Sequence, residues 1–64
     1  MRSEAELWAA APERIQSHGL DAGIFAGMEA DAALAAGDLD RLHELRIILR
    51  RVRMLLDPAR VAPN

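Results

Sequence analysis

The stretch Asp38–Leu56, DLDRLHELRIILRRVRMLL, decides the fold of this chain. Its apolar residues recur at intervals of three and four, the spacing that places side chains on one face of an α-helix. The residues of this apolar row are Leu42, Leu45, Leu49, Val52 and Leu56, and Ile48 and Leu55 widen it. Asp38 is expected to cap the helix, and Asp57-Pro58 to end it. The pattern therefore predicts a long amphipathic helix that faces a core.

A second helix is predicted near the N-terminus, where Ser3-Glu4-Ala5-Glu6 forms a capping box. In that motif the Ser3 hydroxyl accepts the N–H of Glu6, and the Glu6 carboxylate reaches back to the N–H of Ser3. The expected apolar face comprises Leu7, Trp8, Ala11 and Ile15, and His18-Gly19 ends the helix. Pro12 lacks an N–H, so the helix either kinks there or breaks and restarts. A kink is favoured because Ala11 is a poor N-cap residue.

The segment between these two helices predicts a third. Asp21 is the expected N-cap, and Leu20 and Phe25 occupy the two positions of a hydrophobic staple. Gly37 is the expected stop. The expected buried face consists of Ile24, Phe25, Met28, Ala32 and Ala35. The internal Gly23 and Gly27 each weaken a helix by up to about 1 kcal/mol relative to alanine, unless they admit a close neighbouring helix.

A chain of 64 residues has room for one domain with a small core. No stretch alternates apolar and polar residues as a strand does. We therefore predict an all-α fold, a small three-helix bundle over residues 1–57 whose first helix is kinked or broken at Pro12. Residues 58–64 are predicted to form a C-terminal tail. Homodimerisation is an alternative route by which so small a core is completed.

The composition excludes several classes of protein. The absence of cysteine excludes a disulfide framework and a thiolate zinc site. A hydrophobic fraction of 52% excludes an acidic disordered tail. No apolar run approaches the roughly 18 residues of a membrane span. The first residues are acidic where a signal peptide is basic, so we expect a soluble, cytoplasmic protein that contacts no membrane.

The net charge of −2 conceals a strong asymmetry along the chain. Residues 1–40 carry eight acids and two arginines, a net charge of −6, whereas residues 41–64 carry six arginines and two acids, a net charge of +4. One candidate contact surface is acidic and consists of Glu4, Glu13, Asp21, Glu29 and Asp31. The other is a basic stripe on the C-terminal helix, Arg46, Arg50 and Arg53. For both sets the alternative is an ordinary solvated surface.

No catalytic, metal or cofactor site is predicted. Ser3 is explained as a cap, and Ser17 lies beside His18, although adjacent residues of a helix do not face each other. Asp40 and His43 have the spacing of a metal pair, but one pair does not make a site. No glycine-rich phosphate loop is present.

The single tryptophan, Trp8, has two interpretations. It is either a core anchor beside Ile15 and the C-terminal helix, or an exposed interface residue, a role in which tryptophan is enriched.

Several short motifs resemble a family of short, uncharacterised bacterial helical proteins with an E-L-W-A … H-G … G-D pattern. They are Glu6-Leu7-Trp8-Ala9, His18-Gly19, Ala22, Phe25, Gly37-Asp38 and the run Ile48, Arg51 and Leu55. The sequence departs from the family at Pro12, where an aliphatic residue is preferred, and at Leu45, where tryptophan is common. The family has no assigned activity, so the resemblance implies a helical fold and no mechanism.

Taken together, size and charge favour a non-enzymatic protein-interaction module. By analogy alone, phage- or mobile-element-borne inhibitors of host defence complexes, such as anti-CRISPR proteins, are one such group. The acidic surface would then block a basic nucleic-acid groove by steric and electrostatic means. Two alternatives stay open. One is a small nucleic-acid-binding regulator that uses the basic stripe, and the other is a structural homodimeric subunit that uses the apolar row.

Overall fold

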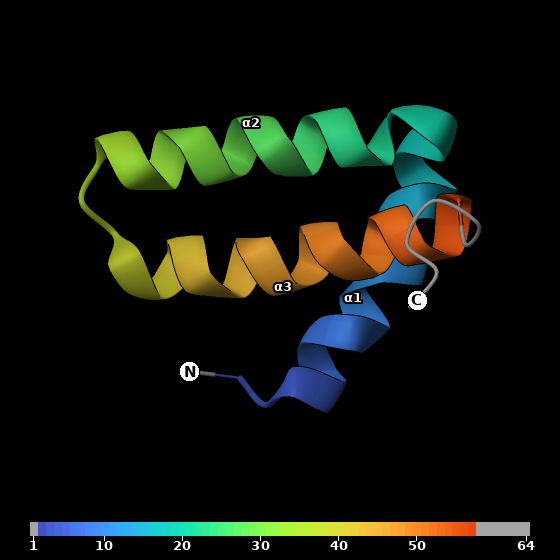
Figure 1. Cartoon of the computed structure of the whole chain (residues 1–64), viewed down its shortest axis with the longest axis horizontal. Coiled ribbons are helices and arrows are strands. Elements are labelled where there is room, and N and C mark those ends of the chain that lie inside the picture. Colours follow the sequence, from blue (N-terminus) through green and yellow to red (C-terminus); the bar gives the residue numbers. More distant parts are fainter. Residues whose placement is uncertain (1, 58–64) are drawn as a thin grey trace, which may run out of the picture.

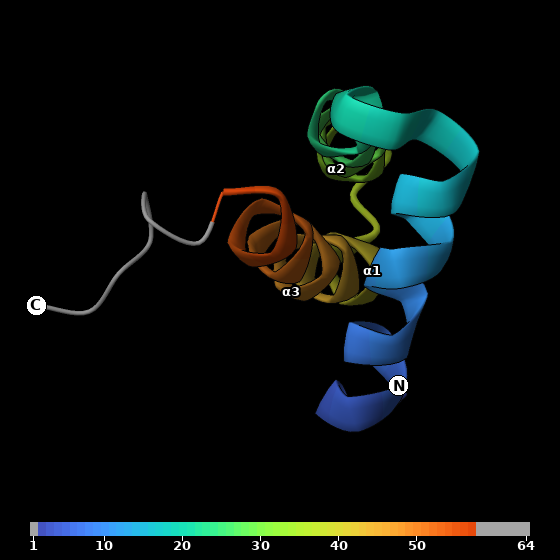
Figure 2. The same cartoon turned by 90° about the vertical axis from the view of Figure 1, so that its right-hand side faces the viewer.

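The computed structural model describes residues 2–57. Its elements are α1 (Glu4–His18), the 3-10 turn η1 (Gly19–Asp21), α2 (Ala22–Ala35) and α3 (Leu39–Leu56). Figure 1 shows α2 and α3 side by side and running in opposite directions, while α1 crosses α3 and leads into α2 (Figure 2). This arrangement confirms the predicted all-α bundle of three helices. The predicted tail over residues 58–64 lies outside the described residues.

Helix α3 is the centre of the bundle, because it packs against both α1 and α2, which touch each other much less. Its buried residues are Leu42, Leu45, Ile48 and Val52, with Leu49 and Leu56 half-buried. Asp38 caps the helix as predicted, since its Oδ1 accepts the N–H of Arg41 at 3.1 Å. Leu55 was expected in the core and is exposed, because the buried face is centred on Ile48 and Val52 and Leu55 lies at its margin.

Helix α1 begins at the predicted capping box. The N–H of Ser3 donates to Glu6 Oε1 at 3.1 Å, and the N–H of Glu6 donates to the Ser3 hydroxyl at 3.2 Å. Pro12 lies inside one helix, so the alternative in which the helix breaks and restarts there is wrong. The proline is exposed, which leaves the carbonyl that loses its N–H partner within reach of water.

The junction between α1 and α2 differs from the prediction. Asp21 makes no capping hydrogen bond, because η1 continues the helical backbone through it and its φ of −86° and ψ of 0° are not those of an extended N-cap residue. The predicted staple is also wrong. Leu20 is 84% exposed, and the ring of Phe25 stacks on that of His18 with the centroids 4.1 Å apart.

The buried face of α2 is not the predicted one. Alanines form it, namely Ala22, Ala26, Ala30 and Ala33, whereas Ile24, Phe25, Met28, Ala32 and Ala35 are exposed. The prediction failed because α2 is apolar around most of its circumference, so helical periodicity does not select one face. The large side chains of α3 select it, because small residues opposite them let the two helices pack closely.

A glycine ends α2 as predicted. Gly37 has a φ of 74°, its N–H donates to the carbonyl of Leu34, and the N–H of Asp38 donates to the carbonyl of Ala33 at 2.9 Å. This pair of hydrogen bonds is a Schellman motif, in which the positive φ favours glycine. The internal Gly27 has no such role, since a Cβ added there would meet no atom within 4 Å. Gly23 lies closer to α3, with Leu49 Cδ1 at 3.9 Å from such a Cβ.

Two glycine substitutions are therefore expected to act in opposite directions. Gly27→Ala should stabilise the fold by about 0.5–1 kcal/mol, because alanine is the better helix former and the added methyl group meets open space. Gly37→Ala should destabilise it by about 1–2 kcal/mol, because its φ is left-handed. Urea unfolding followed by circular dichroism measures both, and a loss of stability in Gly27→Ala would contradict the packing described here.

Arg2, which precedes α1, makes polar contacts with Glu44 of α3. The backbone N–H of Arg2 donates to Glu44 Oε2 at 3.0 Å, and Arg2 Nε lies 3.7 Å from the same oxygen. The hydrogen bond from the backbone of Arg2, together with the charge of its guanidinium, holds the pKa of Glu44 below its ordinary value.

This contact predicts a pH dependence. A carboxyl whose pKa is lower in the folded chain contributes stability above its ordinary pKa, and that contribution is lost as the pH falls through the lowered pKa. Glu44→Gln should therefore lose less stability than the native chain on acidification. Unfolding free energies at a series of pH values measure this, and identical pH dependence in the two proteins would contradict it.

Candidate functional site

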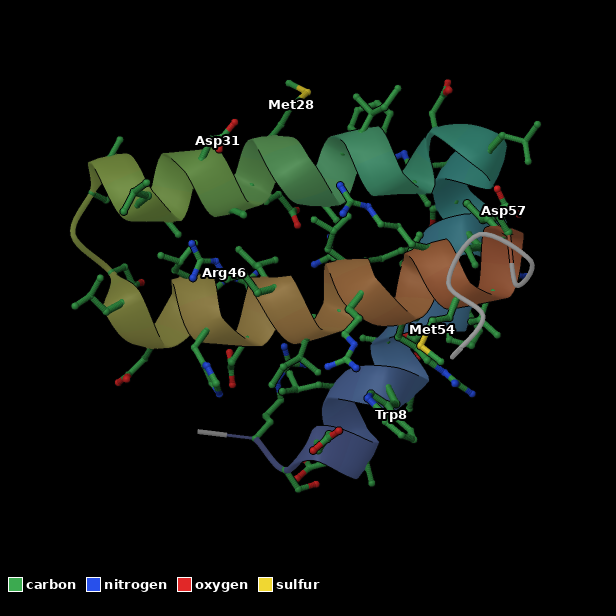
Figure 3. The ribbon with its side chains drawn as sticks, in the orientation of Figure 1. Trp8, Met28, Asp31, Arg46, Met54 and Asp57 are labelled. Carbon is green, nitrogen blue, oxygen red and sulfur yellow. The ribbon has the colours of Figure 1, made fainter. Side chains whose placement is uncertain are left out.

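The outer side of α2 carries large apolar side chains that the bundle leaves exposed. Leu20, Ile24 and Met28 follow one another at intervals of four residues and are 84%, 64% and 61% exposed. Ala32 and Ala35 continue the exposed row toward the end of the helix. Met28 and Asp31 point away from α3 in Figure 3. We call Leu20 of η1 together with Ile24, Met28, Ala32 and Ala35 of α2 the outer face of α2.

Every charged residue in the segment that forms this face is acidic. Residues 19–40 contain acids but no arginine, lysine or histidine. Asp31 lies on the outer side of α2 beside Met28 (Figure 3), and Asp21 is exposed in η1. Glu29, the other acid of α2, pairs with Arg14 of α1. The outer face thus combines exposed apolar side chains with one outward carboxylate, Asp31, beside Met28, and a second exposed acid, Asp21, near its start.

The five acids proposed from the sequence do not gather on one surface. Glu13 and Glu29 line a shallow hollow that also includes Arg14 and His18. Glu4 lines a different hollow, together with Trp8 and Arg50. Asp21 and Asp31 belong to η1 and α2, and only these two border the outer face without an ion pair to another residue of the range 2–57.

The three arginines of the basic stripe, Arg46, Arg50 and Arg53, are all exposed on α3. The ion pairs among residues 2–57 are Arg2–Glu44 and Arg14–Glu29, so none of the three is neutralised by a described acid. Arg50 also lines the hollow that contains Trp8, whereas Arg46 lies on the side of α3 that faces α2 (Figure 3). The stripe is therefore a second charged surface, separate from the outer face of α2.

Trp8 is not the core anchor that was one of the two expectations. It is 43% exposed, and the guanidinium carbon of Arg51 lies 4.8 Å from its ring centroid. Leu7 and Ala11 fill the core position between α1 and α3 instead. Figure 3 shows Trp8 and Met28 on opposite sides of the bundle, so the tryptophan is not part of the outer face of α2.

The groups considered for catalysis and metal binding remain scattered. The His18 ring stacks on Phe25, and no cluster of three or more histidine, cysteine or acidic side chains occurs among residues 2–57. Within the same range, none of the helices has the length and apolar character needed to cross a membrane.

Comparison with known proteins adds no assignment. No protein-family model matches the chain, and neither a curated protein nor a solved structure matches it. The resemblance to short bacterial helical proteins therefore stays a prediction.

The sequence reasoning missed the outer face of α2 because it placed Ile24 and Met28 in the core. A signal was present in the composition of the helix. Ala22, Ala26, Ala30 and Ala33 form a row of small residues on one side, and the large apolar residues lie on the other. A helix of that kind can bury either side, and the partner decides which.

The contact between Arg51 and Trp8 predicts a measurable contribution to stability. Arg51→Met keeps an apolar stem over the indole ring but removes the cation, so it should cost roughly 0.5–1 kcal/mol. Arg53→Met, on the exposed side of α3, is the matched control and should change stability little. Urea unfolding followed by fluorescence of the single tryptophan tests this, and equal effects of the two substitutions would contradict it.

Proposed function

We propose that this protein is a non-enzymatic protein-interaction module that binds a partner protein through the outer face of α2. The observation that carries the proposal is the exposed row of Leu20, Ile24 and Met28. Single apolar residues on a surface are ordinary, but a contiguous apolar row along a helix is typical of an interaction site.

The energetics favour coverage of this face. Burying a large apolar side chain contributes about 1.5–3 kcal/mol when it starts fully exposed, and proportionally less for these partly exposed ones. Methionine suits such a contact because its flexible thioether adapts to different partner surfaces. A helix that is apolar on nearly all sides is characteristic of burial on both sides, and α3 covers only one side of α2.

The proposed interaction includes the case in which the partner is a host defence complex that this protein inhibits. Asp21 and Asp31 are the predicted acidic residues that support it, since they border the outer face. Glu4 and Glu13 lie elsewhere, so the contact that we propose is chiefly apolar, with a negative border.

A nucleic-acid-binding regulator is a second candidate. It is favoured by one observation, the exposure of Arg46, Arg50 and Arg53 without an ion pair to an acid of residues 2–57. Binding to duplex DNA at low salt, lost on replacing the three arginines by glutamine, would support it in place of the proposed function.

The proposed function is tested by photo-cross-linking in the cells that naturally produce the protein. A photoreactive amino acid at position 28 should form an adduct with another protein, because Met28 lies in the middle of the outer face. The same residue at position 39 is the matched control, since Leu39 is as exposed as Met28 but belongs to α3.

Two results would contradict the proposal. One is the absence of an adduct at position 28, and the other is equal adduct formation at both positions. An adduct between two copies of the chain would instead identify the homodimeric subunit.

A further inference from the structure

We propose that the partner of the outer face is a helix with an apolar stripe bordered by arginine or lysine. This inference rests on the proposed function and names the chemistry of the partner. It is carried by the combination of an exposed apolar row with two exposed acids beside it, Asp21 and Asp31, in a segment that contains no basic residue.

The shape of the face suits a helix. Leu20, Ile24 and Met28 span eight residues, which corresponds to about 12 Å along a helix axis. A partner helix matches such a row with apolar residues at i, i+3, i+4 and i+7, whose ridges fit between those of α2. The small Ala32 and Ala35 at the end of the row leave space for larger partner side chains.

The charges specify the border of the partner. Asp31 projects outward beside Met28, and Asp21 is exposed near the start of the row. The absence of any cation in residues 19–40 means that the segment offers these carboxylates no basic neighbour of its own. A partner with arginine or lysine beside its apolar stripe places a cation against each carboxylate, whereas an acidic partner adds like charges.

The same charges disfavour a second copy of this chain. A two-fold contact through the outer face brings the Asp31 residues of both copies into one interface that contains no cation from α2. A carboxylate enclosed in an apolar interface without a cation is costly. The arginines of the chain lie on α1 and α3 or outside the segment that forms this face.

Two designed peptides test the inference on the intact chain. Each is an alanine-rich helix of about 20 residues with leucine at the i, i+3, i+4 and i+7 positions, and only the positions that flank the leucines differ, carrying arginine in one peptide and glutamate in the other. Fluorescence anisotropy of the labelled peptides should show about tenfold tighter binding of the arginine peptide, a preference that shrinks as salt is added.

Matched variants separate the apolar and the charged parts of the contact. Met28→Gln should weaken binding of the arginine peptide, while Leu39→Gln, at an equally exposed leucine outside the face, should leave it unchanged. Asp31→Asn should reduce the preference for arginine over glutamate, and Asp40→Asn, at an exposed acid of α3, should not. These four variants change surface side chains, so circular dichroism should show the native helix content in each.

Three outcomes would overturn the inference. They are equal binding of the two peptides, binding that Met28→Gln does not weaken, and a dimer in analytical ultracentrifugation that Met28→Gln dissociates. Cross-linking at position 28 to another protein, combined with equal peptide binding, leaves the proposed function standing and removes only the basic partner. If position 28 forms no adduct and the two peptides bind equally, both the proposed function and the basic partner are overturned.

Discussion

The alanine face of α2 packs against the leucine and isoleucine side chains of α3, and the rest of the structure depends on this contact. Ala30 and Ala33 meet Leu42 and Leu45 at one end of the hairpin, and Ala22 joins the cluster of Ile48 and Val52 at the other. Small residues opposite large ones let the two helices approach closely without leaving voids. Because the small side chains of α2 pack against α3, its large side chains point to solvent. The candidate binding face is therefore a consequence of how the core packs.

In the folded chain, the acidic and basic parts of the sequence contribute to different surfaces. Ion pairs join Arg2 to Glu44 and Arg14 to Glu29, and they hold the N-terminal segment and α1 against their neighbours. Most of the remaining charges of residues 2–57 are exposed, with Asp21 and Asp31 beside the outer face of α2 and the basic stripe on α3. Exposed charges of this kind contribute little to stability, but they decide which partners approach and which are repelled.

Local signals were sufficient to predict the helices and most of their ends. The capping box at Ser3, the cap at Asp38 and the glycine at position 37 form hydrogen bonds with residues a few positions away. These signals can therefore be recognised from the local sequence alone. The expected cap at Asp21 does not form, because a 3-10 turn continues the helical backbone through this residue. The candidate site was not predicted, because the exposure of Ile24 and Met28 depends on what α3 presents to α2.

The sequence by itself determined that this chain forms helices, where they begin and end, and that its charges divide between its two parts. These properties follow from hydrogen bonds and periodicity within a single segment. Only the tertiary structure decided which side of α2 is buried and whether Trp8 belongs to the core. The physical reason is that burial is a property of a pair of surfaces. A helix that is apolar around most of its circumference has no preferred orientation until the volume of its neighbour's side chains selects the side that fits.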